Sequence, residues 1–91
     1  MKNSLYRQER LIEKLLKFRW KKNGFDLIKV ECYNRFEGDA TMFRVEVYKG
    51  GIGIEDRIMK HEAKISVSFV REAENKLKKI YLNHEYTNAT N

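Results

Sequence analysis

Leu and Ile recur at helical spacing near the start of the chain. At about 100° per residue in an α-helix, five apolar positions share an arc of about 140°, namely Leu5, Leu11, Ile12, Leu15 and Leu16. Asn3 or Ser4 can cap such a helix, and Asn23-Gly24 is a common stop signal. We therefore predict a helix that ends at about residue 22 and turns this apolar arc toward the core.

The next two segments alternate apolar and polar residues with a period of two, which is typical of strands. Residues 26–34 and 41–49 both follow this pattern. Turn-forming residues lie between them at Glu37-Gly38-Asp39, so we predict a β-hairpin. The register that sets opposite charges across the two strands pairs Lys29 with Glu46 and Glu31 with Arg44.

The second half of the chain predicts one more strand and a second helix. Residues 62–69 alternate, with inward positions at Ala63, Ile65, Val67 and Phe69. Ser68 can cap a helix that runs to about Asn83, and its apolar face carries Val70, Ala73, Leu77, Ile80 and Tyr81. Residues 50–61 fit a strand or a helix equally well, and we expect residues 85–91 to form a flexible polar tail.

Together these elements predict one α+β domain over residues 1–84. A chain of 91 residues has room for a single small core. The α-β-β-β-α order predicts a two-layer sandwich, in which both helices cover one face of a three-stranded antiparallel sheet. The opposite face of the sheet would expose Lys29, Glu31, Tyr33, Arg44, Glu46, Tyr48, Lys64 and Ser66.

Charge singles out the first helix. Residues 1–22 carry eight Lys or Arg and two Glu, whereas residues 23–91 carry eleven of each sign, so the first helix holds the whole net charge of +6. Five cations occupy an arc of about 80° away from the apolar arc, over about 21 Å of helix; they are Arg7, Arg10, Lys14, Lys17 and Lys21. Such cations can contact phosphates or an acidic protein surface, with Trp20 or Phe18 available for stacking. A solvated helix face, with both aromatic rings in the core, is the alternative.

Composition indicates the setting of the protein. The single cysteine, Cys32, cannot form an internal disulfide. The chain has neither a signal-peptide pattern nor an apolar run of about 20 residues, so we expect a cytoplasmic protein without membrane contact. Phe, Tyr, Met, Ile, Asn and Lys make up 39 of 91 residues. Their codons are AT-rich, which indicates a low-GC bacterium or one of its phages or mobile elements.

A glycine-rich segment suggests one kind of chemistry. Gly50-Gly51-Ile52-Gly53 follows a predicted strand, and such turns can expose backbone amides to phosphate. The features that follow are a short helix, the strand-like Ile65-Ser66-Val67-Ser68-Phe69 and a helix with Asn75 and Tyr81. Over about residues 42–82 this order resembles the acetyl-CoA-binding half of the GNAT acetyltransferases and implies acetyl transfer. The family's Arg or Gln three residues before the first Gly of its Gly-x-Gly is Tyr48 here.

The α-β-β-β-α order also resembles that of double-stranded-RNA-binding domains. The resemblance is one of topology, and it implies contacts across RNA minor grooves. That family opens its second helix with a lysine cluster, where this chain has Arg71, followed only later by Lys76, Lys78 and Lys79. The family's histidine is also missing from the loop at residues 37–40.

No residue set in the sequence identifies a reaction, a metal site or a cofactor. His61 and His84 adjoin Glu62 and Glu85 but lack partners at metal-ligand spacing, so we expect surface histidines. We expect Cys32 to be a small core residue.

We therefore predict a small non-enzymatic binding protein without a cofactor, whose partner is an anionic macromolecule: an acidic protein surface, a nucleoprotein or nucleic acid. The more specific hypothesis is a phage or mobile-element protein that inhibits a host nucleoprotein, as anti-CRISPR inhibitors do with CRISPR–Cas effectors. Direct DNA or RNA binding is the first alternative and a minimal GNAT-like acetyltransferase the second, and a homodimer stays open. The expected binding residues are Arg7, Arg10, Lys14, Lys17, Lys21, Trp20, Tyr33 and Tyr48.

Overall fold

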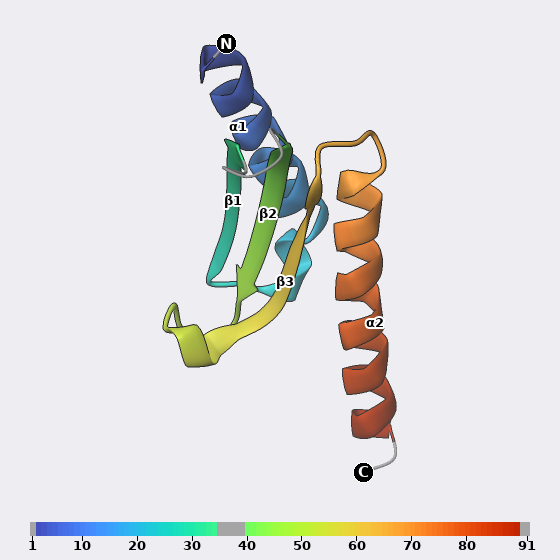
Figure 1. Ribbon diagram of the computed structural model, residues 1–91. Helices are drawn as coiled ribbons and strands as arrows, with labels where there is room; N and C mark the ends of the chain where they lie inside the picture. The colour runs from blue at the N-terminus through green and yellow to red at the C-terminus, as the bar shows by residue number, and fades with distance from the viewer. Residues whose placement is uncertain (1, 35–39, 90–91) are drawn as a thin grey trace.

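Two helices and a three-stranded sheet make up the fold. The computed structural model describes the backbone of residues 2–34 and 40–89 and the side chains of residues 6–34 and 40–80. The elements are α1 (Lys2–Arg19), β1 (Leu27–Asn34), β2 (Thr41–Tyr48), β3 (Arg57–Lys64) and α2 (Phe69–Ala89), with short 3₁₀ turns η1 (Lys21–Asn23) and η2 (Ile54–Asp56). The strands form one antiparallel sheet in the order β1-β2-β3 (Figure 1). The predicted α+β fold is therefore confirmed.

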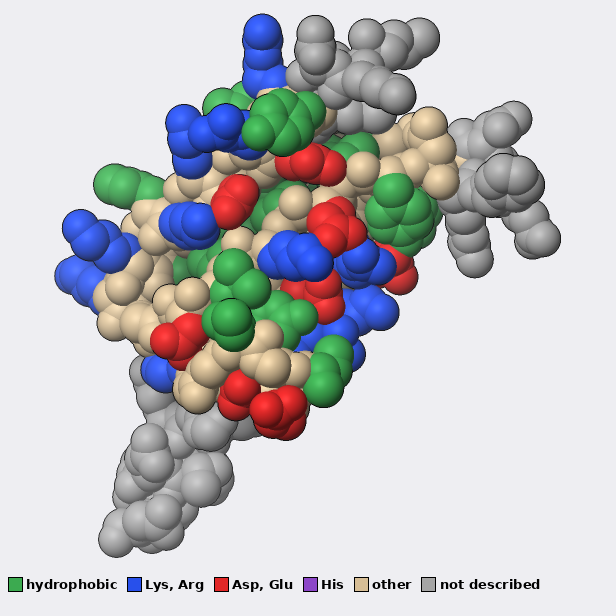
Figure 2. Space-filling model, turned by 90° about the vertical axis from the view of Figure 1, so that its left-hand side faces the viewer, with side chains coloured by type: hydrophobic (Ala, Val, Ile, Leu, Met, Phe, Trp, Pro, Cys, Tyr) green, Lys and Arg blue, Asp and Glu red, His purple; other side chains and the backbone are tan. Residues whose placement is uncertain are grey.

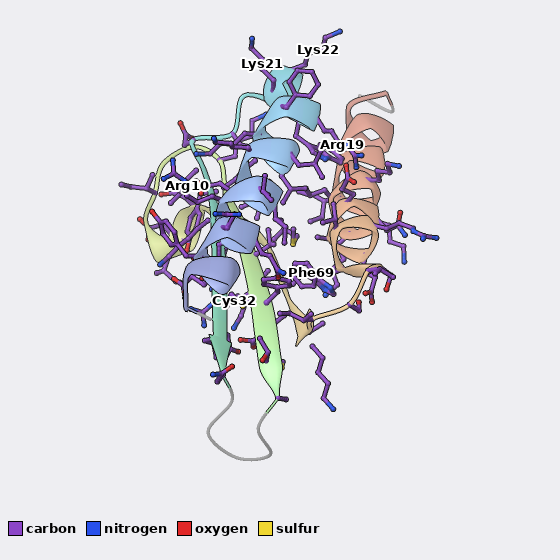
Figure 3. The ribbon with its side chains drawn as sticks, turned by 90° about the horizontal axis from the view of Figure 1, so that it is seen from above. Arg10, Arg19, Lys21, Lys22, Cys32 and Phe69 are labelled. Atoms are coloured by element: carbon purple, nitrogen blue, oxygen red, sulfur yellow. The ribbon has the colours of Figure 1, made fainter. Side chains whose placement is uncertain are left out.

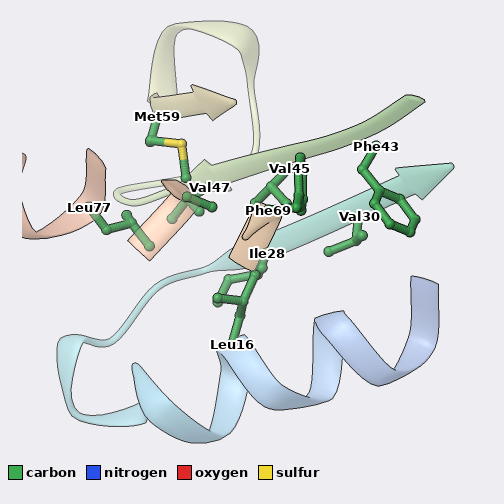
Figure 4. Close-up of a cluster of buried hydrophobic side chains, with 10 residues drawn as sticks. Leu16, Ile28, Val30, Phe43, Val45, Val47, Met59, Phe69 and Leu77 are labelled. Atoms are coloured by element: carbon green, nitrogen blue, oxygen red, sulfur yellow. The ribbon is translucent and has the colours of Figure 1, made fainter. Parts of the chain in front are cut away.

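Both helices cover the same face of the sheet, α1 along β1 and α2 along β3 (Figure 1). Inward side chains of all three strands meet both helices in one core, and Figure 4 shows Leu16 pointing from α1 toward the strands. The core consists of Leu16, Ile28, Val30, Phe43, Val45, Val47, Met59, Phe69, Ala73 and Leu77.

The β1–β2 pairing has the register that the charge pattern predicted. Lys29 faces Glu46 and Glu31 faces Arg44 across the two strands. Because side chains alternate along a strand, this register also sets Ile28, Val30 and Cys32 of β1 opposite Val47, Val45 and Phe43 of β2 on the core face. The turn that we expected at residues 37–39 lies outside the described residues.

The third strand begins five residues earlier than predicted. Arg57–Lys64 pairs with β2, and this places Met59, His61 and Ala63 on the core face. Ile65 and Val67, which we expected to point inward, are exposed in the connection to α2. Residues 62–69 alternate without a break, whereas residues 57–64 have adjacent Ile58 and Met59 and a histidine at an inward position. The earlier strand forms nevertheless because it leaves a shorter connection after β2 than the later one would require.

The second helix begins directly after Ser68, as predicted. The carbonyl of Ser68 accepts the backbone N–H of Glu72 at 2.9 Å, and its hydroxyl lies 3.2 Å from the carboxylate of the same residue. Phe69 reaches the core from the first position of the helix. The helix continues to Ala89, so residues 85–89 are helical where we expected a tail.

The first helix turns only part of its apolar arc toward the sheet. Leu16 is completely buried and Ile12 packs against the core. Leu11 and Leu15 are exposed, so our prediction of a core position for these two residues is wrong. The side chain of Leu5 lies outside the described part.

Contacts near the two ends of α1 explain this rotation. Glu9 accepts the backbone N–H of Cys32 at 2.5 Å, which also satisfies a donor on β1, at the edge of the sheet. Trp20 packs against the core just beyond the other end. Around the helix, Glu9 and Trp20 both lie on the side of Leu16 that is away from Leu11 and Leu15. Because Glu9 and Trp20 face the sheet, Leu11 and Leu15 are turned toward solvent.

Candidate partner-binding surface

The five cations predicted on the first helix all remain exposed. Lys17 binds Glu13 one turn away at 2.8 Å, so its charge is compensated within the helix. Arg10 lies over the ring of Tyr6, 5.7 Å from its centroid. In the part of the chain that the structure describes, no carboxylate pairs with the four remaining cations. We call these four residues the basic stripe: Arg7, Arg10, Lys14 and Lys21.

The basic stripe borders an open depression on the helix surface. The depression has a volume of about 380 Å³, and its lining includes Tyr6, Arg7, Arg10, Leu11 and Lys14. Figure 3 shows Arg10 on the side of α1 away from α2, and Lys21 and Lys22 projecting from the end of the helix. Cationic and apolar side chains are thus presented together on the same face.

A line of apolar side chains runs beside the basic stripe. Leu11 is 60% exposed, Leu15 36% and Phe18 81%. Their spacing of four and then three residues places them along one side of the helix. We call these three residues the apolar ridge. Sequence reasoning missed this feature because it assigned Leu11 and Leu15 to the core.

Trp20 connects the two helices. Its indole N–H donates to Glu74 at 3.0 Å, and Arg19 binds the other carboxylate oxygen of Glu74 at 2.5 Å. The indole also lies 6.3 Å from the ring of Phe25, measured between centroids. The ring is therefore half-buried and held in place, and of the two aromatic residues that we considered for stacking, Phe18 is the accessible one.

This connection gives a testable expectation. Replacing Glu74 by alanine should lower the free energy of unfolding by about 1–2 kcal/mol, because the half-buried indole loses its acceptor and the exposed Arg19 loses a partner. Denaturant titration measures the change. Glu13→Ala is the matched control, since it removes only the surface pair with Lys17 and should cost at most about 0.5 kcal/mol. Equal losses would contradict a structural role for Glu74.

The outer face of the sheet does not present Tyr48 as we expected. Tyr48 is only 7% exposed, and its hydroxyl donates to Glu46 at 3.2 Å. It lies in the central strand, between Leu27 of β1 and Arg57 of β3, so neighbouring side chains can cover it on both sides. The prediction of an exposed Tyr48 is therefore wrong.

Charges on this outer face largely neutralise one another. Arg44 lies at the centre, bound to Glu31 and within 3.8 Å of Glu62 and 3.7 Å of Glu46. Tyr33 is half-buried, donates to Glu62 and lies under the Arg44 guanidinium. On the side of the molecule drawn in Figure 2, basic and acidic side chains are intermingled over the centre.

Two carboxylates of this network have lowered pKa values. The pKa of Glu46 is lowered mainly by the hydrogen bond from Arg57. The hydrogen bond from Tyr48 lowers it further. For Glu31 the main cause is the hydrogen bond from Lys29, whose own pKa is raised by the same contact. Both carboxylates are therefore ionised at neutral pH, and an incoming anion meets less uncompensated positive charge here than on α1.

The glycine-rich loop binds its own carboxylates. The backbone N–H groups of Gly50 and Gly51 donate to one oxygen of Asp26 at 2.6 and 3.0 Å, and Gly53 donates to Asp56 at 3.1 Å. These are the amides that we considered for phosphate. The following helix is the short turn η2, and residues 65–69 do not form a strand. The loop thus lacks the features on which the resemblance to GNAT acetyltransferases depends.

His61 is buried, which corrects our expectation of a surface histidine. It is 7% exposed and lies 5.0 Å from the ring of Phe69. Neither ring nitrogen has a hydrogen-bond partner among the described residues. Burial lowers the pKa of His61, and the nearby charge of Lys76 lowers it further. The side chain of His84 lies outside the described part.

Cys32 is half-buried on the inner side of β1, next to the core. Burial raises the pKa of its thiol, and the carboxylate of Glu9 adds to this effect. Within residues 6–34 and 40–80, no cluster of His, Cys, Asp and Glu could hold a metal ion. Neither described helix has the length and apolar character needed to cross a membrane.

No protein-family model, curated protein or solved structure matches this chain. The surface of α1 therefore has to be interpreted from its own geometry.

Proposed function

We propose that this protein is a non-enzymatic binding protein that attaches to an acidic protein surface through the exposed face of α1. One observation carries the proposal: a basic stripe without carboxylate partners in the described part lies directly beside an exposed apolar ridge. On the outer face of the sheet, by contrast, Lys29, Arg44 and Arg57 are paired with acids.

The apolar ridge favours a protein partner. Fully burying a Leu or Phe side chain contributes about 1.5–3 kcal/mol, and interfaces concentrate their binding energy in such anchors together with Arg. A phosphate backbone can satisfy the basic stripe but offers no apolar surface to Leu11, Leu15 or Phe18. Inhibition of a host nucleoprotein is a finer form of the proposal, and its support is the size and composition of the chain.

Charge reversal tests the proposal with poly-L-glutamate as an acidic probe. The double variant Arg10→Glu/Lys14→Glu should bind poly-L-glutamate at least about tenfold more weakly at low salt, because two attractive contacts become repulsive. Isothermal titration calorimetry measures the affinity. The control is Lys78→Glu/Lys79→Glu, which changes the net charge equally on an exposed part of α2. If both variants lose affinity equally, net charge alone explains binding and the proposal fails.

Direct nucleic-acid binding is a second candidate, favoured by the length of the basic stripe. Arg7, Arg10 and Lys14 lie along α1 and Lys21 lies in η1 just beyond its end. At about 1.5–2 Å per residue, the stripe is long enough to follow several phosphates. Lys17 is already paired with Glu13, so we count four phosphate contacts where the sequence predicted five.

The salt dependence of duplex binding distinguishes this candidate. Four contacts predict a slope of about −3.6 for log affinity against log salt, at about −0.9 per contact. Fluorescence anisotropy with a labelled DNA duplex measures the slope. An affinity that does not change with salt excludes a role for the basic stripe in binding nucleic acid.

A further inference from the structure

The exposed face of α1 carries a heptad pattern. Leu11, Leu15 and Phe18 are separated by four and three residues, which is the spacing of the two apolar positions of a coiled coil. Arg7 and Lys14 are separated by seven residues and occupy the position directly before Leu15 and its equivalent one heptad earlier; Lys21, seven residues further on, lies in η1 just beyond the end of α1. In coiled coils this flanking position pairs with charges on the partner helix.

The same helix already uses its other face. Leu16 and Ile12 pack on the sheet, and Arg19, which flanks the opposite side of the apolar ridge, is bound to Glu74. The ridge and one basic flank thus remain open, while the second flank is occupied within the fold. A partner that packs here is expected to approach α1 from the side of the basic stripe.

We propose that this face docks an acidic amphipathic helix of a partner protein. Apolar residues of that helix would pack against Leu11, Leu15 and Phe18, and its Glu or Asp side chains would lie beside Arg7 and Lys14. This inference rests on the proposed function and specifies its partner. The apolar contact, from Leu11 to Phe18, spans little more than one heptad, so we expect a small, transient interface.

Charge selects this occupant over a second copy of the chain. If two α1 helices packed through their apolar ridges, the flanking positions of one copy would lie beside those of the other. One flank carries the uncompensated cations and the other carries Ile12 and Arg19, so cations of one copy would lie beside cations of the other. Like charges at such positions disfavour pairing. Carboxylates on the partner replace this repulsion by attraction.

A synthetic peptide provides the test. The probe has three heptads, about 21 residues, with Leu at both apolar positions and Glu at both flanking positions, and calorimetry measures its binding to the full chain. We expect saturable binding at one peptide per chain. Phe18→Ala and Leu15→Ala should each weaken it by at least about tenfold, as expected for anchor residues. Ile52→Ala, at an exposed loop position, is the matched control and should have no effect.

Two control peptides separate the inference from the proposed function. A peptide with Lys at the flanking positions should not bind, and a peptide with Ala at the apolar positions should bind at least about tenfold more weakly than the probe. Equal binding of the Ala peptide, or undiminished binding by Phe18→Ala, overturns the docked helix but leaves attachment to acidic surfaces intact.

Absence of peptide binding overturns the inference alone if poly-L-glutamate still binds through the basic stripe. Both proposals fall if neither the peptide nor poly-L-glutamate binds. Binding of duplex DNA in place of both probes would favour the second candidate function.

Discussion

Leu16→Ala should lower the free energy of unfolding by about 2–5 kcal/mol. Leu16 is completely buried between α1 and the sheet (Figure 4). Truncation removes buried methyl groups and leaves a cavity that the surrounding β-strands can fill only partly. For a domain whose total stability is about 5–15 kcal/mol, this is a large fraction. Chemical denaturation followed by circular dichroism measures the change.

Leu11→Ala is the matched control for this experiment. Both residues are leucines in α1, but Leu11 is 60% exposed. Because alanine has a high helix propensity and little apolar contact is lost, we expect a change within about 0.5 kcal/mol. A large loss for Leu11→Ala and a small one for Leu16→Ala would show that α1 turns the opposite face to the sheet, and would remove the apolar ridge from the proposed interface.

His61→Leu should stabilise the protein by about 1 kcal/mol at neutral pH and by more in acid. Leucine has a similar volume and removes two buried nitrogens that lack hydrogen-bond partners in the described structure. The acid effect follows from protonation. Burial lowers the pKa of His61 below its ordinary value of 6.5, so the folded protein binds a proton less readily than the unfolded chain does.

The stability of the original protein should therefore be full above about pH 6.5 and fall as the pH decreases below that value. The fall is at most about 1.4 kcal/mol per pH unit for one proton and ends once the pH passes the folded-state pKa. The positive charge of Lys76 opposes protonation of His61, whereas the negative charge of Glu72 favours it. The pKa of His61 is lowered with both charges present. Denaturant titrations of both proteins between about pH 4.5 and pH 7.5 give the difference. Parallel pH profiles would contradict a buried, unpartnered His61.

The two halves of the sheet show how far alternation predicts a fold. In β1 and β2, alternation and cross-strand charge agree, so the register with Lys29 opposite Glu46 could be predicted. For the third strand, residues 62–69 alternate more regularly than residues 57–64, which form it. The shorter connection after β2 favours the earlier window, and local alternation alone does not contain this constraint.

The candidate surface was likewise only partly predictable. Counting charges located the basic stripe, since the first 22 residues carry the whole net charge of +6. Helical periodicity could not show which part of a broad apolar arc faces the sheet. Contacts of Glu9 with Cys32 and of Trp20 with Glu74 decided that orientation, and they join residues far apart in the chain.

The sequence by itself determined the order of the elements, the α+β class, the hairpin register and the placement of the excess charge on the first helix. These properties depend on local periodicity and on counts of charged residues. Only the tertiary structure decided the start of β3, the burial of His61 and Tyr48, and the exposure of Leu11 and Leu15. Each of these depends on which segments pack together, because burial is a property of neighbours that are distant in sequence.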